Sequence, residues 1–284
     1  MKSIFEHSDP PPELTPYIRQ VMVTDNEETK YTSYQAWPSG YSFFHYIHGG
    51  YFHALVDGDE FTKGPGEMFI AGVIDKQDIV VSFSGRYSEI VSEFTALGMY
   101  QLTGVSGRTC QGRAVDIKMF DPSVRSRCKE FISQCRAEAS TMTSRDCLAL
   151  WYELLNDLAH QPFETPEYLS EAIRRIEHAK GLIKLKQLCE ELNISERQFN
   201  RKFSEIVGIA PKYFIRIGQI NYAMQCALAG DREYFSMIAA SSGYHDESHF
   251  IRAAKSFFGQ PPKEFLSSEQ EIWFEFIRSQ PMTD

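Results

Sequence analysis

One motif occurs twice near the end of this chain of 284 residues, and the two copies are a constant 51 positions apart. The first copy spans residues 192–214 and the second spans residues 243–265. The matched pairs are Ser195 with Asp246, Phe199 with Phe250, Phe203 with Ala254, Gly208 with Gly259, Pro211 with Pro262 and Phe214 with Phe265. A spacing that holds over so many positions predicts two copies of one local structure.

Each copy has the pattern of two short helices joined by a tight turn. In the first copy, residues 185–192 place apolar side chains on one face, and Ser195 is a favourable N-cap for the next helix. At about 100° per residue, Phe199 and Phe203 of that helix face the core. The opposite face carries Arg197, Asn200, Arg201 and Ser204. The pattern predicts a helix-turn-helix, whose second helix can enter a DNA major groove, in preference to a helical domain with duplicated hairpins and no such role.

The exposed face of each second helix carries side chains suited to reading base edges. Arg can grip guanine with two hydrogen bonds, and Asn can do the same with adenine. We therefore predict base contacts from Arg197, Asn200 and Arg201 in the first copy. The second copy offers Ser248, His249, Ile251 and Arg252. Because Ile251 suits either a thymine methyl group or internal packing, we expect the first copy to supply most of the sequence discrimination.

Four lysines are the candidates for contacts with DNA phosphates: Lys202, Lys212, Lys255 and Lys263. Residues 171–266 hold 14 Lys and Arg against 11 Asp and Glu, although the whole chain has a net charge of −9. Between the copies, residues 211–228 predict one helix about 27 Å long, and successive major-groove faces of B-DNA lie about 34 Å apart. One chain can therefore present both second helices to one face of a duplex.

Residues 183–266 resemble the DNA-binding domain of the AraC/XylS family of bacterial transcription regulators. The family's second-half signature corresponds here to Gly243-Tyr244, to Ser248-His249-Phe250-Ile251-Arg252 and to residues 259–265. The first half matches at Ser195, Phe199, Arg201, Phe203, Gly208, Pro211 and Phe214. The resemblance implies a cytoplasmic, sequence-specific regulator of transcription that binds double-stranded DNA at a promoter or operator, and that contacts RNA polymerase if it is an activator.

Two positions depart from the family pattern. The family commonly has Arg-x-x-Arg-Leu in the connecting helix, whereas here Arg216 is followed by Gln219 and Ile220. The usual Phe-Lys of the second copy is Ala254-Lys255. Because phosphate contacts supply much of the affinity for DNA, the missing cation predicts modest autonomous binding. The alternative is a regulator that acts mainly through a protein partner.

The rest of the chain predicts an α+β protein with a different first half. Residues 1–118 are rich in aromatic and β-branched residues broken by glycine-rich turns, which is typical of a small barrel or sandwich. Helical periodicity follows over residues 122–160, with a wide apolar stripe around Trp151. Prolines mark a linker at 161–166. We expect domains at 1–160 and 167–284, the first β-rich and barrel- or cupin-like with flanking helices, the second all-α with two helix-turn-helix motifs.

By the same resemblance, the first domain senses a small-molecule effector or another signal, and its helices pair two chains into a homodimer. Aromatic side chains that can line an effector pocket are Phe43, Phe44, Tyr46 and Phe52, although the core of a strand has the same composition. The tail carries Trp273, Phe274, Phe276 and Ile277, which predict a final docked helix.

Several other functions find little support in the sequence. His45 and His48 would face opposite sides of a continuous strand, so we expect no metal site, although a metal-dependent cupin enzyme would use this region. No phosphate loop, nucleophile elbow or catalytic carboxylate pair stands out, which predicts no enzymatic activity and no cofactor. No secretory signal and no membrane span is expected. The six cysteines form no CxxC pair and suit reduced thiols.

Overall fold

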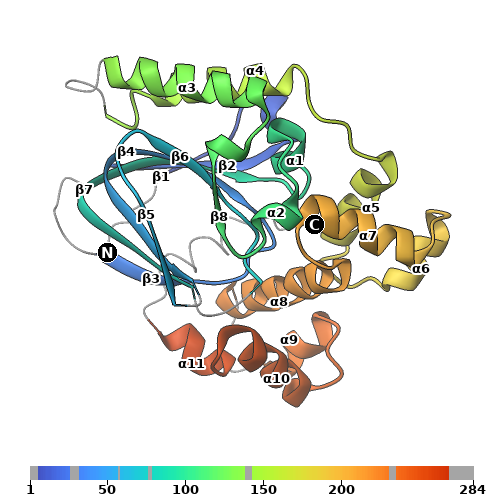
Figure 1. The fold of residues 1–284 in the computed structure, drawn as a ribbon. Helices are drawn as coiled ribbons and strands as arrows, with labels where there is room; N and C mark the ends of the chain where they lie inside the picture. Colours follow the sequence, from blue (N-terminus) through green and yellow to red (C-terminus); the bar gives the residue numbers. More distant parts are fainter. Residues whose placement is uncertain are drawn as a thin grey trace.

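The computed structural model describes residues 6–25, 32–56, 58–75, 79–137, 143–229 and 235–268. A curled β-sheet forms the first half of the chain and a set of short helices forms the second (Figure 1). The strands are β1 (Glu6–Ser8), β2 (Ile18–Asp25), β3 (Thr32–Ala36), β4 (Phe43–Val56), β5 (Asp59–Lys63), β6 (Glu67–Ala71), β7 (Ile79–Phe94) and β8 (Ala114–Asp116). The α+β class predicted from the sequence is confirmed.

All the strands join one antiparallel sheet with the order β1-β2-β7-β4-β6-β8, in which β3 also pairs with β7 and β5 with β4. The long strands β4 and β7 pair along their whole length, and their register shifts at Gly49. Gly50 adopts a φ of +66°, and a Cβ there would lie 2.7 Å from the carbonyl oxygen of Ser84. Glycine therefore permits the bulge at which both strands bend and the sheet curls.

The two faces of the sheet hold separate cores. Phe52, Phe69 and Phe83 belong to the core on the concave face. Phe44 and Ile90 belong to the core on the other face, where α3 (Pro122–Ala137) and α4 (Leu148–Ala159) cover the sheet. These two helices lie across the top of the barrel in Figure 1. The helices expected over residues 122–160 therefore exist, and they pack on the sheet of their own chain.

Side chains at the predicted helix start and on the apolar stripe explain this packing. The Asp121 carboxylate accepts hydrogen bonds from the backbone N–H and the hydroxyl of Ser123. Asp121 thereby caps the N-terminus of α3. Trp151 of α4 is fully buried, packs at a tilt against Phe44, and donates its indole N–H to Ser92 Oγ at 2.8 Å. A buried indole satisfied in this way fixes the position of α4 on the sheet.

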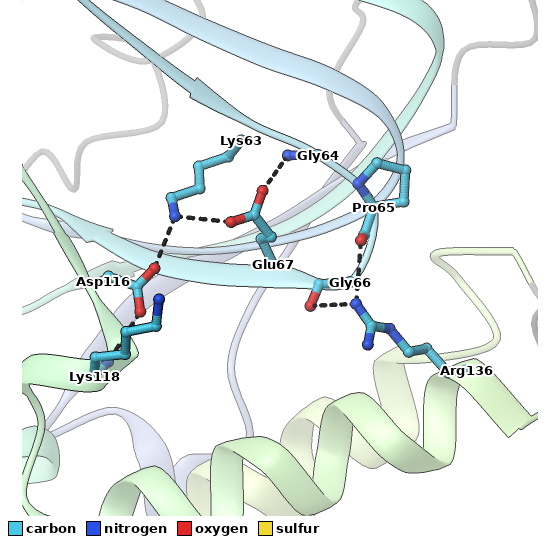
Figure 2. Close-up of polar contacts among 8 residues, drawn as sticks. All are labelled: Lys63, Gly64, Pro65, Gly66, Glu67, Asp116, Lys118 and Arg136. Atoms are coloured by element: carbon cyan, nitrogen blue, oxygen red, sulfur yellow. Dashed lines mark hydrogen bonds and ion pairs between the residues drawn. The ribbon is translucent and has the colours of Figure 1, made fainter.

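A polar cluster fastens the turn between β5 and β6 to its neighbours (Figure 2). The ammonium group of Lys63 donates to Glu67 Oε1 at 2.8 Å and to Asp116 Oδ2 at 2.7 Å. Arg136 of α3 reaches the carbonyl oxygens of Pro65 and Gly66, each at 3.4 Å. The nearly buried lysine is thus paired twice, as burial of a charge requires, and the turn is tied to β8 and to α3.

The proline-rich segment 161–166 is not helical, as predicted, but it is packed against the first half of the chain. Phe163 donates its backbone N–H to the carbonyl of Gln101 at 2.8 Å, and the side chain of Gln101 reaches Thr165. The Phe163 ring packs near Tyr100 of α1 (Gly98–Thr103). The segment therefore fixes where the helical half begins.

The helical half surrounds α8, a helix of 19 residues that passes beneath the barrel in Figure 1. The helices are α5 (Glu167–His178), α6 (Leu185–Glu191), α7 (Glu196–Val207), α8 (Pro211–Ala229), α9 (Phe235–Ser241), α10 (Glu247–Phe258) and α11 (Pro262–Ser267). Their single core also contains Trp37, Tyr41 and Leu97 from the first half. The tail with Trp273, Phe274, Phe276 and Ile277 lies outside the described residues.

Candidate nucleic-acid interface

The first helix-turn-helix consists of α6 and α7. Ser195 caps α7 by accepting a hydrogen bond from the backbone of Gln198 at 3.2 Å. The turn passes through Asn193, whose φ of +52° is tolerated better by Asn than by most residues. Gly208, with a φ of +100°, ends the helix. Phe199 and Phe203 are fully buried, so α7 is held by one face and leaves the other open.

The second helix-turn-helix consists of α9 and α10 and repeats these devices. Asp246 takes the place of Ser195 and accepts from the backbone N–H of His249 at 2.7 Å. That hydrogen bond, followed by one from His245, lowers the pKa of the Asp246 carboxyl. Gly243 supplies the positive φ of the turn, and Gly259 ends α10.

The two turns differ in length by one residue. Helix α6 ends at Glu191 and α9 at Ser241, an offset of 50, whereas α7 and α10 begin at Glu196 and Glu247, an offset of 51. The same backbone bond closes both turns, from Ile194 to Cys189 and from Tyr244 to Ala239. The second turn is therefore one residue longer than the first, and the extra residue lies after Tyr244.

On α7, the predicted base-reading residues lie together on the face opposite the core. Arg197 and Arg201 are exposed, and Asn200 is half-buried. The Asn200 amide donates to the carbonyl of Glu196 at 2.7 Å, so it folds back along its own helix. Lys202 forms an ion pair with Glu205 at 2.9 Å. A phosphate contact by Lys202 would therefore require it to leave this carboxylate.

On α10, Ser248, His249 and Arg252 are exposed, whereas Ile251 is half-buried. The ring of His249 packs edge-on against Tyr244 at 5.3 Å, and its Nδ1 accepts from the backbone N–H of His245. These contacts place His249 at the first turn of the helix with its outer ring edge toward solvent. The three remaining phosphate candidates are all exposed: Lys212, Lys255 and Lys263.

Two contacts fix the helical half of the chain against the β-rich half, and sequence reasoning missed both. Trp37 packs edge-on against Phe258 and Phe265, with ring centroids 5.7 and 5.3 Å away. Tyr41 packs against Phe214 and donates its hydroxyl to Glu177 at 2.8 Å. Because these partners are more than a hundred residues apart, neither contact leaves a periodic signal in the sequence.

A third contact joins α2 (Gly107–Cys110) to the C-terminal end of α7. Ser106 donates its hydroxyl to the carbonyl of Glu205 at 2.6 Å. A Cβ on Gly107 would lie 2.4 Å from the backbone nitrogen of Gly208. The two backbones therefore meet without side chains between them, and the first helix-turn-helix is held by its helix end, away from Arg197 and Arg201.

A cavity of about 140 Å³, partly open to solvent, lies on the concave side of the sheet. Of the four aromatic residues predicted for a pocket, Phe43 and Phe52 line it, but Phe44 and Tyr46 do not. Those two point to the other face, where they pack against Trp151 and Phe131. Side chains alternate along a strand, and the bulge at Gly49 restores Phe52 to the face of Phe43. The prediction is therefore wrong for Phe44 and Tyr46.

Within the described ranges, no three His, Cys, Asp or Glu side chains are grouped so that they could hold a metal ion. His45 and His48 do face opposite sides of β4: His45 contacts Glu89 on the concave side, and His48 contacts Cys147 of the helical layer. None of the helices in these ranges is long and apolar enough to cross a membrane.

Comparisons with known proteins agree with the helical geometry. Residues 188–268 match the family model described as "Helix-turn-helix domain". No curated protein matches the chain. Among solved structures, ToxT from Vibrio cholerae O395 is 14% identical over 89% of this chain and 98% of its own, with a TM-score of 0.43. The AraC-like transcriptional activator CuxR is 13% identical over 69% and 74%, with a TM-score of 0.30.

Likenesses at these TM-scores carry no functional conclusion, but the family match covers both turns and both second helices. It coincides with the capped helices α7 and α10, and it includes every base-reading residue predicted from the sequence. The chain thus contains, over residues 188–268, a DNA-binding helix-turn-helix domain of the AraC type.

Proposed function

We propose that the protein is a sequence-specific transcription regulator whose helices α7 and α10 enter successive major grooves of one duplex. The observation that supports this most is the repeated presentation of two capped helices, each buried on its phenylalanine face and exposed on its Arg face. The 19 residues of α8 span about 28 Å. That length suits a separation of about 34 Å between groove faces when the packing distances are added.

The two recognition helices, α7 and α10, contribute unequally in this proposal. Arg197 and Arg201 supply two guanidinium groups with access to solvent, and a guanidinium can grip guanine bidentately. Helix α10 supplies Arg252, with His249 and Ser248 at its start. Ile251 is half-buried, so its part is limited to an apolar contact. Most base discrimination is therefore assigned to α7.

The cavity supports the second part of the proposal, an effector that changes DNA binding. Trp37 lies in the cavity wall. It also packs on Phe258, the last residue of α10, and on Phe265 of α11. A molecule that displaces this indole changes the packing under the second helix-turn-helix. The coupling between the cavity and the helical core is direct, because the Trp37 side chain contacts both.

Binding to DNA from upstream of the protein's own coding region, compared with a random duplex of equal length, tests the regulator proposal. Specific affinities usually exceed non-specific ones by about 10³ or more. The salt slope should match a small number of phosphate contacts, because three of the four predicted lysines, Lys212, Lys255 and Lys263, are exposed, whereas Lys202 is held in an ion pair with Glu205. Equal affinity for both duplexes would refute sequence-specific recognition at that site.

A second candidate function is a regulator that works mainly through a protein partner. It is favoured by Gln219, which occupies the position where the family has a second Arg. Its amide donates to the carbonyl of Ser242 at 2.8 Å and thus holds the second turn instead of a phosphate. If purified protein binds no duplex tightly but does bind the promoter in the presence of a partner, this second function replaces the first.

A further inference from the structure

The cavity inside the curled sheet has the size of a single six-membered ring with a short substituent. Its volume is about 140 Å³, and an apolar cavity of about 150 Å³ is known to hold benzene. Met22, Val81 and Val91 form apolar parts of its wall, together with the rings of Phe43 and Phe52. Displacement of water from such a surface favours an apolar occupant.

One part of this wall is polar, and it is built from two buried side chains. Glu89 is 1% exposed and His45 is 8% exposed. The His45 Nδ1 lies 3.1 Å from Glu89 Oε2, and the His45 ring stacks flat on Phe69 at 4.5 Å. An ionised carboxylate can only accept, so Nδ1 carries the proton of this hydrogen bond. Stacking on Phe69 then fixes the direction of the other ring nitrogen.

Both groups therefore have hydrogen-bond acceptor capacity left over. In neutral His45 the Nε2 atom is an acceptor, and it has no partner among the residues that the structure describes. The Glu89 carboxylate also faces the Tyr87 hydroxyl, whose pKa is raised by burial and then by the charge and hydrogen bond of Glu89. Its two oxygens offer about four acceptor sites, so lone pairs remain beyond these two partners. Burial, and then the charge of Glu89, raises the pKa of Tyr34 in the same wall. The carboxylate thus imposes a negative potential on this side of the cavity.

The described wall holds no permanent cation that would compensate that charge for an anion, and its second histidine, His7, pairs through Nδ1 with the Gln20 side chain. The residues that line the cavity include no Lys and no Arg. The indole N–H of Trp37 is buried without a partner, but it has no surface open to the cavity. A carboxylate-bearing ligand would lose its hydration and face the like charge of Glu89, which disfavours its binding when no cation is present.

We propose that this cavity binds a ring-sized apolar molecule that bears an amine or hydroxyl donor, and that the donor is held by Glu89 and His45. Carboxylates of the same size are excluded. The inference rests on the proposed effector response, because it names the chemical class of the molecule that would reach Trp37.

The test uses four probes that share one ring: benzylamine, benzyl alcohol, toluene and benzoate. Affinity is measured by titration calorimetry with the full-length protein. We expect benzylamine and benzyl alcohol to bind at least tenfold more tightly than toluene, and benzoate to bind most weakly. Benzoate binding equal to that of benzylamine overturns the inference, as does failure of all four probes to bind.

Two variants separate the polar pair from simple cavity filling. Glu89→Gln keeps the size of the side chain but removes the charge, so benzylamine should lose at least tenfold in affinity while toluene is unchanged. Glu60→Gln is the matched control, because Glu60 of β5 is exposed and lies outside the cavity. Val81→Phe fills the cavity and should block every probe. If Glu89→Gln leaves the benzylamine preference intact, Glu89 is not the determinant and the inference fails.

DNA binding gives a separate readout. If the donor-bearing probes bind as expected but do not change the affinity for operator DNA, the ligand class stands and the effector proposal falls. If operator binding is specific but no probe binds, the regulator proposal stands and the ligand class falls.

Discussion

The indole of Trp37 packs edge-on against the ring of Phe265, with centroids 5.3 Å apart and planes inclined at 80°. A second edge-on contact joins Trp37 to Phe258. One side chain between β3 and β4 therefore supports the packing of α10 and α11 while it lines the cavity. This relationship makes Trp37 a direct physical link between the cavity and the helical half of the chain.

Replacement of Trp37 with Ala should uncouple the cavity from the second helix-turn-helix. Large-to-small changes at buried aromatic residues cost about 3–5 kcal/mol of unfolding free energy, so a loss of that size is expected in urea denaturation. Phe52→Ala is the matched control, because Phe52 lines the same cavity without contacting the helices. Both variants should be destabilised, but only Trp37→Ala should abolish the effect of a bound probe on DNA affinity. An intact response in Trp37→Ala would place the coupling elsewhere.

Arg201→Ala and Arg252→Ala should each weaken binding to the specific site by about 1–3 kcal/mol and relax one base preference. Binding to random duplex should change much less, because base contacts carry the sequence information. Arg174→Ala serves as the control, since Arg174 lies on α5, is exposed, and pairs with Glu171. Electrophoretic mobility shifts with single-base operator variants measure the effect. Equal losses on both duplexes would mean that these guanidinium groups contact phosphates.

Gly107→Ala should lower the unfolding free energy by about 1–3 kcal/mol, as overpacking of a tight contact does. The new Cβ would lie 2.4 Å from backbone atoms at the end of α7, and backbone cannot move aside cheaply. Gly218→Ala in α8 is the control, because its Cβ would be at least 3.6 Å from its neighbours and removal of a mid-helix glycine stabilises by about 0.5–1 kcal/mol. If Gly107→Ala proves as stable as the wild type, α2 and α7 are not in contact in solution.

Asp116→Asn should destabilise the protein at neutral pH but not in acid. Burial alone would raise the pKa of Asp116, but the hydrogen bond and charge of Lys63 hold it below its ordinary value of 3.8. A carboxyl with a lowered pKa in the folded state stabilises above its unfolded pKa, and that contribution disappears as pH falls through the folded pKa. The loss should be about 1–3 kcal/mol at pH 7 and should shrink below about pH 4. A difference that does not change with pH would argue against the Lys63 ion pair.

The recognition helices could be predicted from the sequence because the signals that define them are local. A capping Ser195 or Asp246, an apolar face and a terminal glycine all fall within a dozen residues of one another. Such features depend on backbone geometry and short-range hydrogen bonds, which a short stretch of chain determines by itself.

The cavity and the contacts between the halves could not be predicted in this way. The aromatic run in β4 was visible, but which of its members face inward depends on the bulge at Gly49, and a shift of one residue reverses every side chain. Trp37 and Gly107 meet partners that are more than a hundred residues away. Those contacts exist only once the sheet has curled and α8 has docked beneath it.

The unlikeness of α7 and α10 has a consequence for the DNA itself. Helix α7 presents two exposed arginines, whereas α10 presents one arginine and a half-buried isoleucine, and both belong to one chain. A protein that carries two different recognition helices in tandem has no two-fold axis to impose on its target. The DNA that one chain covers should therefore be an asymmetric pair of unlike half-sites with a defined direction along the promoter, and a search for inverted repeats of that length would pass over it.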